Sequence, residues 1–227
     1  MTMLGTTPIK AVLFDLDGTL LDTAPEFYFI ANQMLEQRDI APVDYAVFRE
    51  SVSDGARGMV KTAFSLDEND PQFEPLRLEF LAQYSALLAT RTELFAGMND
   101  VLDFIESESL AWGIVTNKPN AFAEPLLRAL NLFERCAVLV CPDHVRDRKP
   151  HPEALYLACD KIGCSIDEAI YVGDHRRDIE AARNANMTSI ACSFGYVHGD
   201  DPCENWSADF IAHDAIQIIP ILQNRLD

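Results

Sequence analysis

The chain has 227 residues, of which 48% are hydrophobic, and a formal net charge of −18 at pH 7. This length allows one large domain, or a core with a smaller inserted unit, and the apolar content excludes a largely disordered chain. The negative charge argues against nucleic acid or an anionic membrane as a standing partner, because binding phosphate groups uses Lys and Arg in excess.

Residues 1–8 lack a secretion signal, and no apolar run approaches the roughly 18 residues that a membrane span needs. The six cysteines show neither C-x-x-C nor Cys/His zinc spacing, which favours free thiols over disulfide bonds or a zinc site. We therefore expect a soluble, cytoplasmic protein that is a monomer or a homodimer.

Short apolar runs alternate with helical patterns along most of the chain. This alternation predicts an α/β fold, with a parallel sheet covered by helices on both faces. The expected strands are Ile9–Phe14, Trp112–Thr116, Ala137–Cys141, Ala169–Gly173 and Thr188–Cys192. Helical spacing of apolar residues is found in Met98–Glu108, Ala121–Leu130, Pro152–Ile162 and Asp178–Asn184. The tail from Trp206 onward is expected to close an edge of the sheet.

The interval 23–95 differs from the rest of the chain. Its apolar residues recur at helical spacing, and it has no strand pattern comparable to the others. It is also far longer than a single crossover between two strands requires. We interpret 23–95 as a helical cap domain inserted into a catalytic core that is formed by 1–22 and 96–227.

Two carboxylates follow the first expected strand directly. Asp15 and Asp17 stand in the segment Asp15-Leu16-Asp17-Gly18-Thr19, where a buried strand meets a glycine turn. Two carboxylates this close require a cation, a shared proton, or a division into acid and base roles. The pattern therefore indicates a catalytic site.

Polar residues also follow the later strands. Thr116 and Asn117 come at the end of the second strand, Lys149 lies in a later loop segment, and Asp174 and Asp178 follow the fourth strand. Because the carboxyl ends of strands in an open parallel sheet share one crevice, these side chains are expected to converge there.

This ordered set of motifs resembles the haloacid dehalogenase superfamily over essentially the whole chain. The family patterns D-x-D-G-T, Ser/Thr, Lys and G-D-x-x-x-D match, in order, Asp15–Thr19, Thr116, Lys149, and Gly173 with Asp174 and Asp178. The resemblance implies a three-layer, Rossmann-like core with strand order 5-4-1-2-3. The insert between the first and second motifs implies the subclass that has a helical cap there.

The resemblance also implies a phosphomonoester hydrolase that acts through an aspartyl-phosphate. Asp15 would be the nucleophile, and Asp17 would act as general acid and then as general base. A Mg²⁺ ion would be held by the Asp15 carboxylate, the Asp17 backbone carbonyl and Asp174, with Asp178 supporting these ligands.

The phosphoryl oxygens would be held by Thr116, Asn117 and Lys149, and Lys149 would supply positive charge in an acidic protein. Substrate choice is expected to depend on the cap, where Ser53–Gly58 is interpreted as a loop with a cation between two glycines. Arg57 in this segment would pair with an anionic group of the substrate. A solvated surface arginine is the alternative for Arg57.

Further segments resemble the phosphoglycolate phosphatase group and, more narrowly, bacterial phosphatases of N-acetylmuramic acid 6-phosphate. They are Asp54–Val60, Val115–Pro119, Val140–Val145 and Phe194–His198. The expected partner is therefore a small phosphorylated metabolite, with the amino-sugar phosphate preferred to phosphoglycolate.

Other members of the superfamily fit less well or stay open. A mutase of the β-phosphoglucomutase type stays open, because it shares the cap and both aspartates. Dehalogenases lack an aspartate at the position of Asp17, and transport ATPases have membrane helices. A phospho-accepting receiver module is about half this length and lacks the cap.

Overall fold

The computed structural model describes residues 7–226. Residues 1–6 and 227 lie outside the described residues. They belong to the expected core, and residues 1–6 also belong to the N-terminal segment that was expected to lack a secretion signal. The structure divides into two compact units, of which one runs to Leu21 and resumes at Leu94, while the other spans Asp22–Glu93. The sequence pattern places the corresponding boundaries after residues 22 and 95. The chain passes between the units through β2 (Leu21–Asp22) and β3 (Glu93–Leu94), which pair as a two-stranded sheet.

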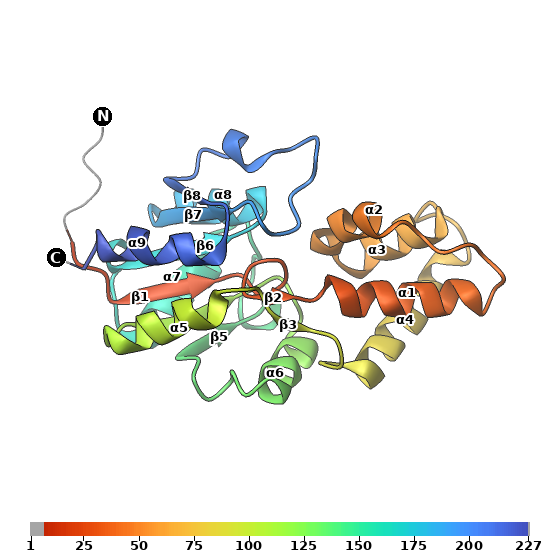
Figure 1. Cartoon of the computed structure of the whole chain (residues 1–227), viewed down its shortest axis with the longest axis horizontal. Helices are drawn as coiled ribbons and strands as arrows, with labels where there is room; N and C mark the ends of the chain where they lie inside the picture. The colour runs from red at the N-terminus through yellow and green to blue at the C-terminus, as the bar shows by residue number, and fades with distance from the viewer. Residues whose placement is uncertain (1–6, 227) are drawn as a thin grey trace. The chain divides into compact units, whose positions relative to one another are not determined.

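The first unit is built on a parallel sheet of six strands within the described residues, in the order β5-β4-β1-β6-β7-β8 (Figure 1). The strands are β1 (Ala11–Phe14), β4 (Ala111–Val115), β5 (Val138–Val140), β6 (Ala169–Gly173), β7 (Thr188–Cys192) and β8 (Phe210–Ala212). The α/β class is confirmed. From β7 to β5, the order of the five expected strands reads 5-4-1-2-3, and β8 adds an edge strand that the five-strand expectation lacks. This strand comes from the tail that was expected to close the sheet.

The central strand β1 lies between β4 and β6 and is paired in register with both. Its Ala11 pairs with Ala111 of β4 on one side and with Ala169 of β6 on the other. All its residues are buried, as is typical of a strand whose two faces are both covered. The residue that follows β1 therefore lies in the middle of the edge at which β4 and β6 also end.

Helices cover both faces of the sheet. On one face, α7 (Glu153–Ile162) packs against β1, β4 and β5, and the adjacent α8 (Arg176–Ala185) packs against β6 and β7. On the other face, α5 (Met98–Ser107) packs against β4 and against α9 (Ile218–Gln223), as Figure 1 shows. A further helix, α6 (Asn120–Ala129), follows β4, and short 3-10 helices are η2 (Pro142–His144), η3 (Ile166–Glu168), η4 (Cys203–Asn205) and η5 (Ala215–Gln217).

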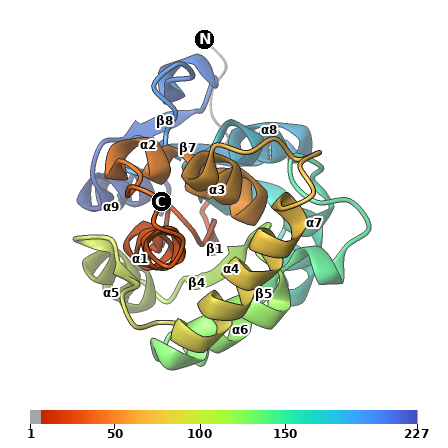
Figure 2. The same cartoon turned by 90° about the vertical axis from the view of Figure 1, so that its right-hand side faces the viewer.

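The second unit consists of helices, apart from its ends in β2 and β3. They are α1 (Ala24–Glu36), α2 (Tyr45–Glu50), α3 (Gly55–Phe64) and α4 (Phe73–Leu87), and α1 packs against the other three. Figure 2 shows α1 nearly end-on. The ring of Phe27 on α1 lies 4.5 Å from Tyr84 and 6.0 Å from Phe80 of α4, between ring centroids. These buried aromatic side chains form part of the unit's own core.

The segment Ser53–Gly58, which the sequence predicts as a loop, is helical. The 3-10 helix η1 (Ser51–Asp54) runs directly into α3, and Gly55 separates them with a φ of 70° and a ψ of −166°. Only glycine adopts this conformation readily, so the pattern of two glycines breaks the helix for a single residue instead of opening a loop. The loop prediction was therefore wrong. Among the described residues, no helix has the length and apolar character that crossing a bilayer requires.

Candidate active site

Asp15 lies directly after β1 and continues its pairing. Its backbone N–H donates to the carbonyl of Val172 on β6 at 2.9 Å. Its carboxylate Oδ1 accepts a hydrogen bond of 2.7 Å from the N–H of Leu16. The first hydrogen bond fixes the backbone of Asp15 against β6, and the second fixes its buried carboxylate against the following residue.

Three buried carboxylates meet at this edge of the sheet: ligand atoms of Asp15, Asp174 and Asp178 all lie within 4.8 Å of one another. Asp174 follows β6, and Asp178 lies in the first turn of α8. The parallel pairing of β1 with β6 brings them together. Carboxylates held this close in a buried site repel one another, so the cluster fits a divalent cation with oxygen ligands.

The charges around these carboxylates differ. Burial, followed by the charges of Asp15 and Asp178, raises the pKa of Asp174 to about 7. Burial would also raise the pKa of Asp15, but the positive charges of Lys149 and Arg177 outweigh it and lower that pKa. Burial keeps the pKa of Asp178 above its usual value despite the nearby Lys149. The carboxylate expected to attack phosphorus is therefore kept ionised.

Lys149 supplies a positive charge at the centre of the cluster. Its Nζ lies 3.0 Å from Asp15 Oδ1 and 2.7 Å from Asp178 Oδ1. The same ammonium donates to the carbonyl of Val115 at 3.0 Å and to the hydroxyl of Tyr171 at 2.7 Å. With 2% of its surface exposed, Lys149 is a fixed component of the site and not a mobile surface lysine.

Both oxygens of Asp174 are held by hydrogen bonds. Oδ1 accepts a bond of 2.9 Å from the Thr19 hydroxyl, and Oδ2 accepts a bond of 2.8 Å from the N–H of Tyr196. Thr19 belongs to the turn after β1, in which Gly18 has a φ of 85°. The last residue of D-x-D-G-T thus orients the aspartate of the fourth motif.

Asp17 faces a cation that the sequence analysis did not single out. The Nζ of Lys118 lies 2.9 Å from Asp17 Oδ1 and 3.3 Å from Oδ2. Lys118 is part of the segment Val115–Pro119, but no role was assigned to it. The available signal was its position two residues after Thr116, at the end of a strand in a strongly acidic chain.

Thr116 and Asn117 organise the turn after β4. The Thr116 hydroxyl oxygen accepts a hydrogen bond of 3.1 Å from the N–H of Lys118. The side-chain amide of Asn117 donates to the backbone carbonyl of Lys149 at 3.2 Å. This amide, expected on a phosphoryl oxygen, here ties the turn after β4 to the segment that carries Lys149.

His175 caps the N-terminus of α8 and directly follows Asp174. Its Nδ1 accepts a hydrogen bond from the N–H of Arg177 at 3.1 Å, and its ring stacks on Trp206 with a centroid distance of 6.4 Å. Burial, followed by the charge of Arg177, lowers the pKa of His175 to about 3. The imidazole is therefore neutral at pH 7, as suits a residue that caps a helix.

Arg57 belongs to the other unit, on α3. Its Nη1 lies 2.6 Å from Glu68 Oε2, and both side chains are at least half exposed. Its guanidinium also lies 6.0 Å from the centroid of the Phe73 ring. Within its unit, Arg57 is thus an exposed, ion-paired cation.

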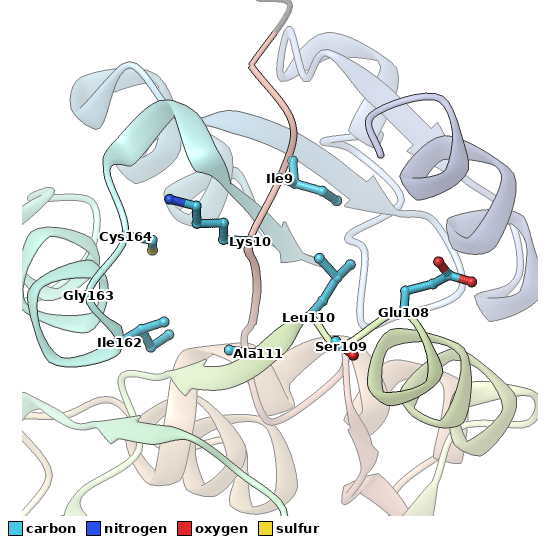
Figure 3. Close-up of a pocket in the computed structure, with 9 residues that line it drawn as sticks. All are labelled: Ile9, Lys10, Glu108, Ser109, Leu110, Ala111, Ile162, Gly163 and Cys164. Carbon is cyan, nitrogen blue, oxygen red and sulfur yellow. The ribbon is translucent and has the colours of Figure 1, made fainter. Parts of the chain in front are cut away.

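A pocket of about 390 Å³ lies elsewhere on the core unit (Figure 3). Lys10 and Leu110, which line it, come just before β1 and β4, and Gly163 follows α7. Because the carboxylates follow the opposite ends of these strands, this pocket is separate from the cluster of Asp15, Asp174 and Asp178.

Comparisons with known proteins agree with this geometry. Residues 12–192 match the family model for haloacid dehalogenase-like hydrolases. The chain is 45% identical over 218 residues to the N-acetylmuramic acid 6-phosphate phosphatase of Pseudomonas putida, covering 96% of this chain and 98% of that protein. It is 44% identical over 209 residues to the phosphoglycolate phosphatase of Xanthomonas campestris, covering 92% and 94%. The crystal structure of a predicted phosphoglycolate phosphatase from Haemophilus somnus shares the fold, with a TM-score of 0.83, 24% identity, and coverage of 96% and 99%.

Proposed function

The chain belongs to the haloacid dehalogenase-like hydrolase family, and we propose that it is a phosphatase that hydrolyses N-acetylmuramic acid 6-phosphate in peptidoglycan recycling. The observation that carries the reaction class is the buried cluster of Asp15, Asp174 and Asp178, neutralised in part by Lys149. The relatives from two Pseudomonas species, which bear this phosphatase's name, support the substrate.

In the first step, the Asp15 carboxylate attacks phosphorus. An oxygen–phosphorus bond forms to Asp15, and the bond between phosphorus and the ester oxygen breaks. Asp17, which enters this step protonated, gives its proton to the departing alkoxide, so that an alcohol leaves. The lowered pKa of Asp15, caused by Lys149 and Arg177 against the effect of burial, keeps the nucleophile ionised.

In the second step, water hydrolyses the aspartyl-phosphate. Asp17, now a carboxylate, takes a proton from the water as its oxygen attacks phosphorus. The bond between phosphorus and Asp15 breaks, inorganic phosphate leaves, and both aspartates return to their starting states. Thr116, Asn117 and Lys149 are proposed to hold the phosphoryl oxygens through both steps, which stabilises the charge that develops on them.

The residues of the cluster fit a divalent cation, since three buried carboxylates offer oxygens within 4.8 Å of one another. We assign Asp15, the Asp17 backbone carbonyl and Asp174 as the residues that would hold Mg²⁺, with Asp178 in support. When bound, Mg²⁺ neutralises negative charge on the phosphoryl group and makes phosphorus more electrophilic.

Substrate selection is assigned to the unit Asp22–Glu93, acting as a cap. Arg57 is proposed to exchange its partner Glu68 for the substrate's carboxylate, which its half-exposed position allows. Phosphoglycolate phosphatase is the second candidate, because relatives of that name are almost as similar to this chain and phosphoglycolate also carries a carboxylate.

The test is a phosphate-release screen in the presence of Mg²⁺. It compares N-acetylmuramic acid 6-phosphate with 2-phosphoglycolate and hexose phosphates, and we expect the highest kcat/KM for the amino-sugar phosphate. A preference for 2-phosphoglycolate would favour the second candidate instead. The Asp15→Asn variant, checked for folding by circular dichroism, should lose all activity, and a variant that still turned over would exclude Asp15 as the nucleophile.

A further inference from the structure

The ion pair between Lys118 and Asp17 is largely shielded from solvent. The Lys118 side chain is 6% exposed and that of Asp17 is 18% exposed. Nζ contacts both carboxylate oxygens, at 2.9 and 3.3 Å, so the pair has two fixed contacts instead of one. An ion pair of this kind restricts the rotation of the carboxylate more than an exposed pair would, because neither partner can move freely into solvent.

The backbone of Lys118 is held in the turn that also presents Thr116. Its N–H donates to the Thr116 hydroxyl oxygen at 3.1 Å, and Pro119 after it leads into α6 at Asn120. Asp17 lies in the turn after β1, where it forms an isolated bridge with Leu21. The ion pair therefore joins the turns that follow two adjacent parallel strands, β1 and β4.

The two buried lysines of the site contact different carboxylates. Lys149 lies against Asp15 and Asp178, whereas Lys118 lies against Asp17. Asp17 must present a carboxyl oxygen to the leaving oxygen in one step and to water in the next. Both transfers depend on geometry, because a proton moves only when donor and acceptor are within hydrogen-bond reach.

We propose that Lys118 is a positioning residue for Asp17, which orients the carboxyl group toward the leaving oxygen. This inference rests on the proposed function. It assigns Lys118 no contact with the reacting atoms, and Lys118 acts only through Asp17. Replacing Lys118 should therefore lower kcat/KM more for an ester whose leaving group needs a proton than for one whose leaving group does not.

Alkyl and aryl esters separate this role from a general structural one. An alkoxide leaves fast only with a proton from Asp17 and slowly without it, whereas 4-nitrophenolate is a stable anion and leaves without one. The kcat/KM value covers events up to the first irreversible step, here taken as transfer of phosphate to Asp15. The ratio of the two kcat/KM values in one preparation is independent of the fraction of protein that is folded.

The experiment measures kcat/KM for N-acetylmuramic acid 6-phosphate and for 4-nitrophenyl phosphate with Mg²⁺, in wild type, Lys118→Met and Lys118→Gln. In both variants we expect the alkyl-to-aryl ratio to fall by about 10- to 100-fold, the scale of rate loss that follows small misplacements of a catalytic group. Lys161→Met, which removes an exposed lysine of α7, is the matched control and should keep the wild-type ratio.

A double-variant cycle checks that Lys118 acts through Asp17. On an Asp17→Asn background, Lys118→Met should cause no further loss in the ratio, since the group that it positions can no longer transfer a proton. A further fall there, or an equal loss on both esters in Lys118→Met alone, would overturn the positioning role while leaving the phosphatase proposal intact. A wild-type protein without activity on any ester would overturn both.

Discussion

Gly18 lies directly against the carboxylate of Asp174. A Cβ on Gly18 would stand 2.1 Å from Asp174 Oδ2 and 2.8 Å from Cδ2 of Tyr196. The φ of Gly18, 85°, lies in the region that L-residues with side chains rarely adopt. The turn after β1 can therefore approach the end of β6 only if this residue has no side chain. This explains physically why a glycine follows the second aspartate.

Replacing Gly18 with alanine should disturb the site more than the fold. The added methyl group must displace Asp174 or the turn itself, and the strained backbone costs about 1–2 kcal/mol of unfolding free energy. We expect kcat to fall by at least about 100-fold, as for other misplaced catalytic groups. Gly163→Ala is the matched control, because its φ is 83° and nothing lies within 4 Å of a Cβ there. The Gly163→Ala variant should lose a similar free energy of unfolding in urea but keep the wild-type kcat. Equal losses of kcat in the two variants would show that the approach of Gly18 to Asp174 is not what the activity depends on.

Without the proposed Mg²⁺, the stability of the protein should depend on pH through Asp174. Burial and the neighbouring carboxylates raise the pKa of Asp174 from 3.8 to about 7 in the metal-free protein. The folded state then binds this proton more tightly than the unfolded state, so its contribution to stability falls as pH rises from about 4 to about 7. The proposed Mg²⁺ would compete with this proton for Asp174, so its stabilising effect should grow over the same range.

Thermal unfolding with and without Mg²⁺ measures this effect. We expect the increase in Tm caused by Mg²⁺ to be larger at pH 8 than at pH 5.5 by about 2–4 °C, which corresponds to about 1 kcal/mol for a chain of this size. Asp174→Asn should flatten most of this pH dependence. An increase in Tm that is the same at both pH values would show that Asp174 does not compete for the ion. In activity assays, a chelator should abolish turnover, and added Mg²⁺ should restore it.

Tyr171 should matter for the position of Lys149. Its hydroxyl accepts from Lys149 Nζ at 2.7 Å and donates to the Val115 carbonyl at 2.7 Å. Tyr171→Phe leaves these buried groups with one partner fewer, at a cost of about 1–3 kcal/mol in stability. We expect kcat/KM to fall by roughly 10-fold as Lys149 becomes less fixed. Tyr156→Phe removes the hydroxyl of an exposed tyrosine of α7 and should change neither stability nor kcat/KM. A wild-type kcat/KM in the Tyr171→Phe variant would show that this hydroxyl does not help to position Lys149.

Arg57→Ala should change substrate selection without weakening the fold. Because the pair with Glu68 is exposed, its loss should cost less than about 1 kcal/mol of unfolding free energy. We expect KM for N-acetylmuramic acid 6-phosphate to rise by about 10-fold, as for the loss of one charge-assisted hydrogen bond, and KM for 4-nitrophenyl phosphate to stay within about twofold. Arg77→Ala, which removes an ion-paired arginine of α4, should leave both KM values unchanged. Equal changes for the two esters would deny Arg57 a selective role.

The sequence predicted the residues whose position depends on a strand and the turn that follows it. Asp15 and Asp174 come directly after buried apolar runs, and the parallel sheet brings such positions to one edge whatever the details of packing. The helical form of Ser53–Gly58 was missed, because two glycines indicate a loop when read locally. Packing in that unit instead accommodates a single break at Gly55. The edge strand β8 was anticipated only as a tail closing the sheet, since its short run resembles any apolar loop.

By itself, the sequence determined the order of strands and helices and the spacing of the motifs, because apolar periodicity and glycine turns are local properties of the chain. Which charges face each other was decided only by the tertiary structure. Lys118 and Asp17 are 101 residues apart, and nothing in either segment indicates the other. Their contact exists because β1 and β4 are neighbours in the sheet and both side chains are largely buried, so that each charge is stabilised by the nearest one of opposite sign.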